Sequence, residues 1–255
     1  MNRIKKITNI RKKLNSGLPT IGSWMQLESS DIGEIMGDAG YDWVALDLEH
    51  GHFSSSELTN LIRSIELNNT LGMIRVSSSD SLNVKKALDA GAGGVILPMI
   101  NSAKALKDIV ESCCWPKSGN RGVGFSRANL YGKYFKEYIK EAQAPLIIAQ
   151  IESIRALQEL DNILEVKKLD AIMIGSYDLS ASIGKPGEFT SNKYKETVKK
   201  IISICRKKHK AFGIHIVDPD PNVLSKKIKN GYQFIAYSID SVFLNKYSLN
   251  PMKAK

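Results

Sequence analysis

The chain has few of the residues that mark secreted or membrane-bound proteins. It contains three cysteines among 255 residues, two of them adjacent, and no CxxC pair. A sparse, odd set of this kind favours reduced thiols over a disulfide framework. No run reaches the ~18 apolar residues of a membrane span, and the N-terminus lacks the pattern of a signal peptide. These absences predict a cytoplasmic protein without a membrane partner.

Acidic charge is also in deficit, since the formal net charge is +10 at pH 7. A basic chain suits a polyanionic partner. The excess, however, is mostly lysine spread over predicted helical faces, such as Lys199-Lys200 and Arg206-Lys207-Lys208. No nucleic-acid motif accompanies it. Solvated lysine faces are therefore favoured, and a non-catalytic nucleic-acid-binding protein stays as the alternative from another class.

Strand-like and helix-like patterns alternate along the chain. Eight apolar segments predict strands at 21–27, 43–48, 73–76, 94–98, 146–151, 171–174, 212–217 and 234–238. Eight such units in one chain of this length are typical of a (β/α)8 barrel. A doubly wound open sheet is the alternative, but no GxGxxG follows the first strand. We therefore predict one α/β barrel domain over residues 1–255.

Two segments depart from this alternation. Ile4, Ile7, Ile10 and Leu14 recur at helical spacing before the first strand. They predict a helix that plugs the bottom of the barrel, with a membrane-surface helix as the alternative. Residues 115–140 are rich in Gly, Arg and Tyr and show no clear strand, which predicts a functional loop or lid.

Polar residues follow the predicted strands, where parallel α/β folds place their chemistry. Asp47 precedes His50 by three residues, so its carboxylate could bond the imidazole and make it a better base. The later strand ends carry Arg75, then Gln150 and Glu152, then Ser176 and Asp178, and then His215. No strand end presents the lysine that a Schiff-base aldolase needs.

Glu152 and Asp178 end adjacent predicted strands, so they could share one divalent cation. A pair of carboxylates suits Mg²⁺ or Mn²⁺ and leaves positions open for water and substrate. The alternative is that Asp178 caps the helix that follows it and that Glu152 pairs with a lysine. The residues alone leave both alternatives open.

Short segments, each weak alone, occur in the order and at the strand ends of one family. They are Gly22-Ser23-Trp24, Ala39-Gly40-Tyr41-Asp42-Trp43, Asp47-Leu48-Glu49-His50-Gly51, Ala87-Leu88-Asp89-Ala90-Gly91-Ala92, Leu97-Pro98-Met99, Asn120-Arg121-Gly122-Val123-Gly124, Gln150-Ile151-Glu152-Ser153 and Ile174-Gly175-Ser176-Tyr177-Asp178-Leu179-Ser180. Through them the chain resembles the HpcH/HpaI family of metal-dependent pyruvate aldolases, which includes 4-hydroxy-2-oxoheptanedioate aldolase and 2-dehydro-3-deoxyglucarate aldolase.

The resemblance implies a reaction and a catalytic set. The reaction is retro-aldol cleavage of a 4-hydroxy-2-oxo acid to pyruvate and an aldehyde, or the reverse condensation, through a metal-bound enolate. Glu152 and Asp178 would be the metal ligands, for Mg²⁺ or Mn²⁺, with Co²⁺ as a further candidate. His50, held by Asp47, would be the base, and Arg75 would steady the enolate oxygen.

Substrate contacts are implied for Gln150, for Ser176 and Tyr177 at a helix start, and for Asp89, which the family contributes from a neighbouring subunit. The family further implies a homo-oligomer, a trimer or hexamer, with C-terminal helices exchanged between subunits. One departure concerns specificity. The family commonly has Gly-Pro-Ala-Asp where this chain has Gly175-Ser176-Tyr177-Asp178, so the aldehyde stays open. Oxaloacetate decarboxylation and CoA-ester cleavage on the same barrel are the alternatives within enzymes.

Overall fold

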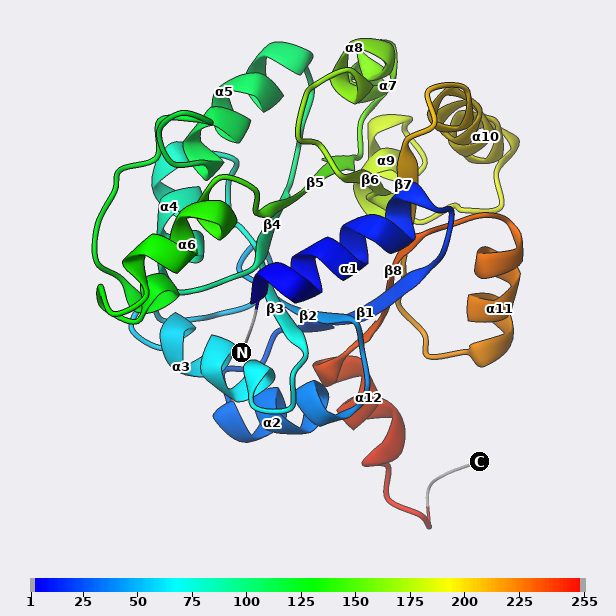
Figure 1. The fold of residues 1–255 in the computed structure, drawn as a ribbon. Coiled ribbons are helices and arrows are strands. Elements are labelled where there is room, and N and C mark those ends of the chain that lie inside the picture. Colours follow the sequence, from blue (N-terminus) through cyan, green and yellow to red (C-terminus); the bar gives the residue numbers. More distant parts are fainter. Residues whose placement is uncertain (1–2, 253–255) are drawn as a thin grey trace.

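Eight parallel strands close into a barrel in the computed structural model, which describes residues 3–252 (Figure 1). Each strand pairs with the next, and β8 pairs with β1. The strands are β1 Thr20–Met25, β2 Trp43–Asp47, β3 Leu71–Arg75, β4 Gly94–Leu97, β5 Leu146–Ile151, β6 Ala171–Ile174, β7 Ala211–Ile216 and β8 Phe234–Ile239. The predicted (β/α)8 barrel is confirmed.

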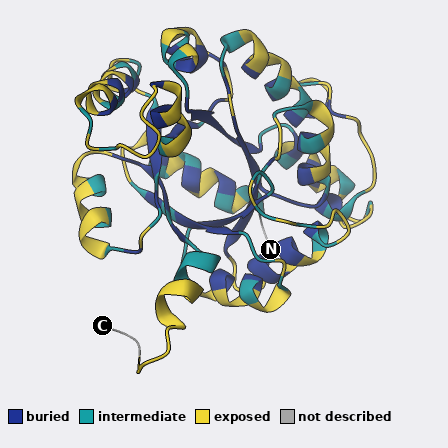
Figure 2. Ribbon diagram, turned by 180° about the vertical axis from the view of Figure 1, so that it is seen from behind, coloured by how far each residue is buried: buried dark blue, intermediate teal, exposed yellow. Residues whose placement is uncertain are grey.

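Helices surround the strands on all sides (Figures 1 and 2). They are α1 Arg3–Asn15, α2 Ser30–Asp38, α3 Leu58–Glu66, α4 Ser81–Asp89, α5 Ala103–Cys113, α6 Phe135–Ala142, α7 Ile154–Gln158, α8 Leu160–Leu164, α9 Ser176–Ser182, α10 Asn192–Lys207, α11 Pro221–Lys229 and α12 Asp240–Tyr247, with a 3₁₀ turn, η1, at Arg127–Asn129. Serine and aspartate caps begin several of them, because their side chains accept orphan backbone N–H groups; these caps are Ser29, Asp80, Ser102, Ser153, Ser191 and Asp220.

Strand alternation decides which side chains enter the barrel, because successive residues point to opposite faces. On β7, Ala211 belongs to the interior cluster, whereas Phe212 and Ile214 pack outward with the helices. The same period turns His215 inward. By this rule Asp47, Arg75 and Gln150 also face inward, since each lies two residues beyond Ala45, Met73 or Ile148 of the interior cluster. The carboxyl ends of these strands form what we call the mouth.

The N-terminal helix α1 plugs the opposite end of the barrel (Figure 1). Ile7, Ile10 and Leu14 are buried in the interior cluster, while Ile4 is half-buried. Arg11 anchors the helix through its Nε atom, 2.6 Å from Asp170 Oδ1. The predicted plug is confirmed, and the apolar face that a membrane-surface helix would need is covered by the barrel.

Residues 115–140 are more ordered than the sequence predicts. The segment contains η1 and most of α6, which pack around a small core of Trp115, Tyr138 and Ala142. It links α5 to β5, so it lies on the amino-terminal side of the strands. Arg3 of α1 donates to Glu141 of α6 at 2.6 Å. Within one chain the segment therefore sits beside the plug and does not cover the mouth.

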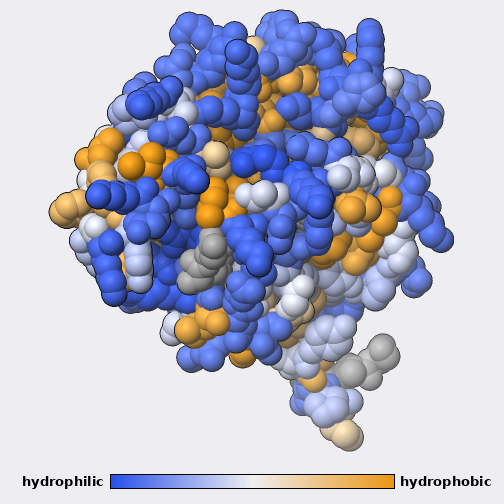
Figure 3. All heavy atoms as spheres, viewed as in Figure 1, coloured by the Kyte–Doolittle hydropathy of each residue, from blue (hydrophilic) through white to orange (hydrophobic). Residues whose placement is uncertain are grey.

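The surface matches a chain rich in solvated lysine. Figure 3 shows hydrophilic side chains over most of the face that carries α1, with small apolar patches between them. In the described part of the chain, no helix is both long and apolar enough to cross a membrane. The C-terminal helix α12 packs against β1 and β8 of its own chain and leaves Leu244 and Tyr247 exposed. Exchange of this helix between subunits stays a prediction.

The plug generates a first testable prediction. Ile7→Ala should lower the free energy of unfolding by about 2–5 kcal/mol, because it leaves a cavity at the base of a filled barrel. Urea unfolding followed by circular dichroism measures this loss. The matched control on the same helix is Asn9→Ala, an exposed position where the change should stay within about 0.5 kcal/mol. Equal effects of both variants would show that α1 does not fill the barrel.

Candidate active site

A buried ion pair lies at the centre of the mouth. Arg75 Nε donates to Asp47 Oδ1 at 2.7 Å, and Arg75 Nη2 donates to Oδ2 at 2.6 Å. Asp47 is fully buried, and register pairs these two residues at the ends of β2 and β3. Burial alone would raise the pKa of Asp47, but the bonds from Arg75 hold it below its usual value. The two parallel bonds fix the plane of the guanidinium.

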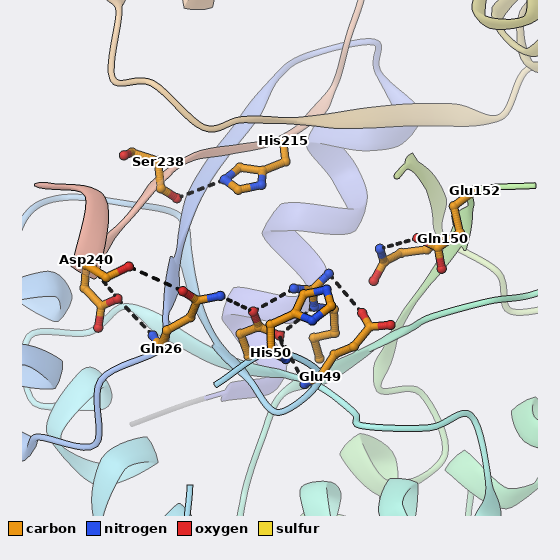
Figure 4. A network of polar contacts seen from close by, with 11 residues as sticks. Gln26, Glu49, His50, Gln150, Glu152, His215, Ser238 and Asp240 are labelled. Carbon is orange, nitrogen blue, oxygen red and sulfur yellow. Dashed lines mark hydrogen bonds and ion pairs between the residues drawn. The ribbon is translucent and has the colours of Figure 1, made fainter. Parts of the chain in front are cut away.

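Three further groups hold the Arg75 guanidinium and its partner in place. Glu49 Oε2 lies 3.0 Å from Arg75 Nη1, and the guanidinium carbon lies 4.5 Å from the centre of the Trp24 ring. Gln26 Nε2 donates to Asp47 Oδ2 at 2.8 Å. Figure 4 shows Gln26 reaching from β1 toward this network, with Asp240 behind it. Arg75 is therefore pre-oriented, and the two carboxylates beside it carry more negative charge than its guanidinium can neutralise.

His50 follows the ion pair in the turn after β2, and its side chain is exposed. The backbone N–H of His50 donates to Asp47 Oδ1 at 3.3 Å, and that of Glu49 donates to the same oxygen at 3.1 Å. The expected bond from Asp47 to the imidazole is therefore replaced by one to the backbone. The reason is competition, because Arg75 and Gln26 already engage the carboxylate.

A second pair of acidic residues lies across the mouth: Glu152 directly follows β5, and Asp178 lies in α9, which follows β6. Glu152 is buried and accepts from Gln150 Nε2 at 3.0 Å (Figure 4) and from the Met99 backbone N–H. Burial raises the pKa of Glu152 to about 7, the Met99 N–H opposes the rise, and the Glu49 and Asp178 carboxylates add to it. Glu152 and Asp178 are therefore close enough to repel each other.

Local backbone geometry makes room for this pair. Gly175 comes directly before α9, and a Cβ atom there would collide with the carboxylate of Glu152. The N-cap of α9 is Gly175 rather than Asp178, which lies within the first turn of the helix. The alternative that Asp178 caps this helix is therefore wrong. The hydrogen bonds to Glu152 come from Gln150 and from the Met99 backbone N–H, rather than from the lysine of that alternative.

The donor set fits a divalent cation. Among the residues that the structure describes, the buried Oε1 atom of Gln150 has no hydrogen-bond partner, so an oxygen acceptor is available beside Glu152 and Asp178. Two carboxylates and an amide oxygen are ligands that Mg²⁺ and Mn²⁺ accept. Among residues 3–252, no group of three or more His, Cys, Asp or Glu side chains forms a metal site. A cation here would therefore keep open positions for substrate.

The roles of two contributors to the site could not be read from the sequence, although Met99 ends the family segment Leu97-Pro98-Met99. Met99 takes part through its backbone N–H, at a positive φ of 53°, so its side-chain type says nothing of its role. Gln26 lies inside the predicted strand 21–27, where nothing marks it as a site residue. His215, a half-buried titratable side chain of the mouth, was visible as a strand end. Its ring lies 5.9 Å from Trp24.

The other three expected substrate contacts, Ser176, Tyr177 and Asp89, lie in three different surroundings. Ser176 begins α9 at the mouth. Tyr177 is 58% exposed, and its ring meets the ring of Phe189 edge-on, with 5.0 Å between the ring centres. Asp89 ends α4 away from the mouth and lines a surface cavity of about 490 Å³ with Lys85 and Arg127. Within one chain, Asp89 therefore does not join the other site residues.

Known proteins match nearly the whole chain in sequence and in fold. Residues 20–246 match the family model of HpcH/HpaI aldolase/citrate lyase. A 4-hydroxy-2-oxovalerate aldolase of Rhodococcus jostii is 31% identical, over 94% of this chain and 93% of its own length. A 2-keto-3-deoxy-L-rhamnonate aldolase of Klebsiella pneumoniae is 32% identical, over 91% and 87%. The crystal structure of an HpcH/HpaI aldolase/citrate lyase family protein from Burkholderia cenocepacia superposes with a TM-score of 0.88 at 27% identity, over 94% and 96%.

The chain therefore belongs to the HpcH/HpaI aldolase/citrate lyase family, as its motifs indicate. It is a carbon–carbon lyase of the aldolase type. This membership favours an enzyme over the non-catalytic nucleic-acid-binding alternative. The two aldolases just described are named for different 2-oxo acids, so kinship leaves the aldehyde unspecified.

His215 generates the pH prediction of this site. Burial and then the Arg75 charge lower the pKa of His215 to about 4, against an ordinary 6.5. Between pH 4 and pH 6.5, His215 therefore binds a proton in the unfolded chain but not in the folded chain. Stability is then full above pH 6.5 and is lost as the pH falls toward 4. His215 should account for about 2 kcal/mol lost between pH 7.5 and pH 5.

Urea unfolding at pH 7.5 and pH 5 measures this loss. His215→Gln should shrink the difference between the two pH values, because the variant has no proton to gain. The control is His52→Gln, at an exposed position that should leave the difference unchanged. The same loss in wild type and His215→Gln would show that His215 titrates normally in the folded chain.

Proposed function

We propose that this enzyme cleaves a 4-hydroxy-2-oxo acid to pyruvate and an aldehyde, and catalyses the reverse condensation. The observation that carries the proposal is the mouth itself. A carboxylate pair beside an unpartnered amide oxygen faces a pre-oriented guanidinium and an exposed imidazole. These groups are suited to bind a 2-oxo acid by its two oxygens and to move a proton. The oxygen atoms that could bind a metal support class II, metal-dependent chemistry. Schiff-base chemistry would need a lysine at a strand end, and none of the eight described strands ends in one.

Glu152 and Asp178 would hold the divalent cation, with Gln150 beside them. Mg²⁺ or Mn²⁺ is our choice of ion, with Co²⁺ as a further candidate, because the donors are oxygens. A cation bound there supplies Lewis acidity at the keto and carboxylate oxygens of the 2-oxo acid. The raised pKa of Glu152 supports this assignment, since a buried carboxylate among like charges needs a counter-charge.

The protein's own residues then carry the steps. In cleavage, His50 takes the proton of the 4-hydroxyl group, the bond between C3 and C4 breaks, and its electron pair moves to the 2-oxo oxygen. Arg75 stabilises the negative charge that develops on this oxygen. The protonated imidazole of His50 then gives its proton to C3 as the 2-oxo group forms again, which completes pyruvate. The first backbone N–H groups of α9, at Ser176 and Tyr177, have no partners within the helix and suit the substrate carboxylate.

Assembly would complete the site. Asp89 ends α4 away from the mouth of its own barrel, so we propose that it contributes to the active site of a neighbouring subunit. The exposed apolar residues Leu244, Tyr247 and Leu249 support exchange of α12 in a trimer or hexamer. Unpaired Cys113, Cys114 and Cys205 suit a reducing, cytoplasmic setting.

Metal dependence is the first functional prediction. Glu152→Gln and Asp178→Asn should each abolish pyruvate release from 4-hydroxy-2-oxo acids, because each removes one anionic ligand. Exhaustive chelation should abolish it in the wild type, and Mg²⁺ or Mn²⁺ should restore it. A coupled pyruvate assay gives the rate. The control is Asp108→Asn, a surface carboxylate paired with Lys104, which should keep full activity. Activity that survives chelation would refute the assignment.

The base generates the next prediction. His50→Ala should lower kcat by roughly 10²–10⁴-fold, the usual contribution of general acid–base catalysis. Exchange of the pyruvate methyl protons in D₂O, followed by NMR, isolates proton transfer from aldehyde binding. His52→Ala is the control, two residues along the same turn. If His50→Ala exchanged protons at the wild-type rate, another group would have to be the base.

A further inference from the structure

His215 is a half-buried polar group of the mouth that the proposed chemistry leaves unused. Its side chain enters the barrel from β7, one layer above Gly213, and its ring meets the edge of Trp24 at 5.9 Å. Trp24 in turn stacks on Arg75. Figure 4 shows the imidazole reaching toward Ser238, in the part of the view away from His50 and Glu49. The ring therefore borders the space in which a substrate bound at Arg75 would lie.

The backbone of β8 is shaped to hold one ring nitrogen. His215 Nε2 lies 3.3 Å from the carbonyl oxygen of Ser238. Ser238 has a positive φ of 58°, and pairing between β1 and β8 shifts register at this level. A left-handed residue in a strand is strained unless its surroundings hold it. Here the Ser238 hydroxyl donates to the Val217 carbonyl at 2.9 Å, which fixes the turned peptide.

This contact determines the tautomer. A carbonyl oxygen only accepts hydrogen bonds, so Nε2 must carry the proton. Burial and the Arg75 charge keep the pKa of His215 far below neutrality, so the ring carries a single proton. The Nδ1 atom is then an acceptor with a free lone pair. Among the described residues, the ring has no hydrogen-bond partner besides Ser238.

We propose that His215 is a specificity-determining residue whose Nδ1 atom accepts a hydrogen bond from a hydroxyl group on the aldehyde part of the substrate. The preferred aldehydes are then small hydroxyaldehydes. This inference rests on the proposed function and adds the class of aldehyde to it. An alkyl aldehyde would leave the Nδ1 lone pair without a donor, and such an unpaired polar atom costs discrimination.

Charge argues against an aldehyde with a terminal carboxylate. The mouth already holds Asp47, Glu49, Glu152 and Asp178 around the guanidinium of Arg75. Pyruvate adds one negative charge. A second substrate carboxylate beside the Nδ1 lone pair would meet an acceptor and find no hydrogen to share, because both groups are acceptors at neutral pH.

Matched aldehydes test the proposal in the condensation direction, with pyruvate and Mg²⁺. Glycolaldehyde and propanal have the same number of heavy atoms and differ by a hydroxyl in place of a methyl group. We compare kcat/KM for this pair in the wild type and in two variants. His215→Leu has no acceptor. His215→Asn places an amide oxygen near the position of Nδ1. The Ser238 carbonyl stays paired in both, because the Ser23 hydroxyl also donates to it.

The ratio of glycolaldehyde to propanal should fall about 10-fold in His215→Leu, the value of one hydrogen bond, and stay within about 3-fold of wild type in His215→Asn. A purely structural role would lower both rates and leave the ratio unchanged, which would overturn the proposal. So would a wild-type preference for propanal or for succinic semialdehyde, a measurement that needs no variant. If wild-type enzyme neither exchanged pyruvate protons nor condensed any aldehyde, the proposed function itself would fail.

Discussion

The buried ion pair between Asp47 and Arg75 is the interaction on which the mouth depends. Asp47 receives both hydrogen bonds of the guanidinium, one from Gln26 and two from the backbone after β2. It therefore orients a cation, a neighbouring strand and the turn that carries His50 at once. Removal of either partner leaves a buried charge, and such losses typically cost about 3–5 kcal/mol. The pair is as much a scaffold as a charge.

The mouth carries more negative than positive charge. Burial raises the pKa values of Glu49 and Glu152, and the charge of Arg75 opposes this rise. One guanidinium cannot neutralise all the carboxylates around it. Such a site favours bound cations and a substrate that chelates them. It also disfavours additional substrate carboxylates. The same excess of negative charge thus links the metal site to the choice of aldehyde.

Much of this could be predicted from local patterns. The eight strands followed from apolar runs between helix caps, and the plug from isoleucines at helical spacing. Asp47, Arg75, Gln150 and Glu152 followed from a rule of parallel barrels, that carboxyl ends of strands meet at one face. The 115–140 segment was harder. Its helix α6 is held by Trp115 and Tyr138 in a small core of its own, which no periodic pattern announces.

The sequence by itself determined the architecture and the types of groups at the mouth, because the two-residue period of strands and the order of elements are local properties. Tertiary structure alone decided how those groups pair. Asp47 sits three residues from His50 in the chain, yet its carboxylate bonds Arg75, 28 residues away, because parallel pairing of β2 with β3 sets the two residues side by side. The Met99 N–H, the turned Ser238 carbonyl and the tautomer of His215 likewise depend on backbone geometry that only the closed barrel imposes.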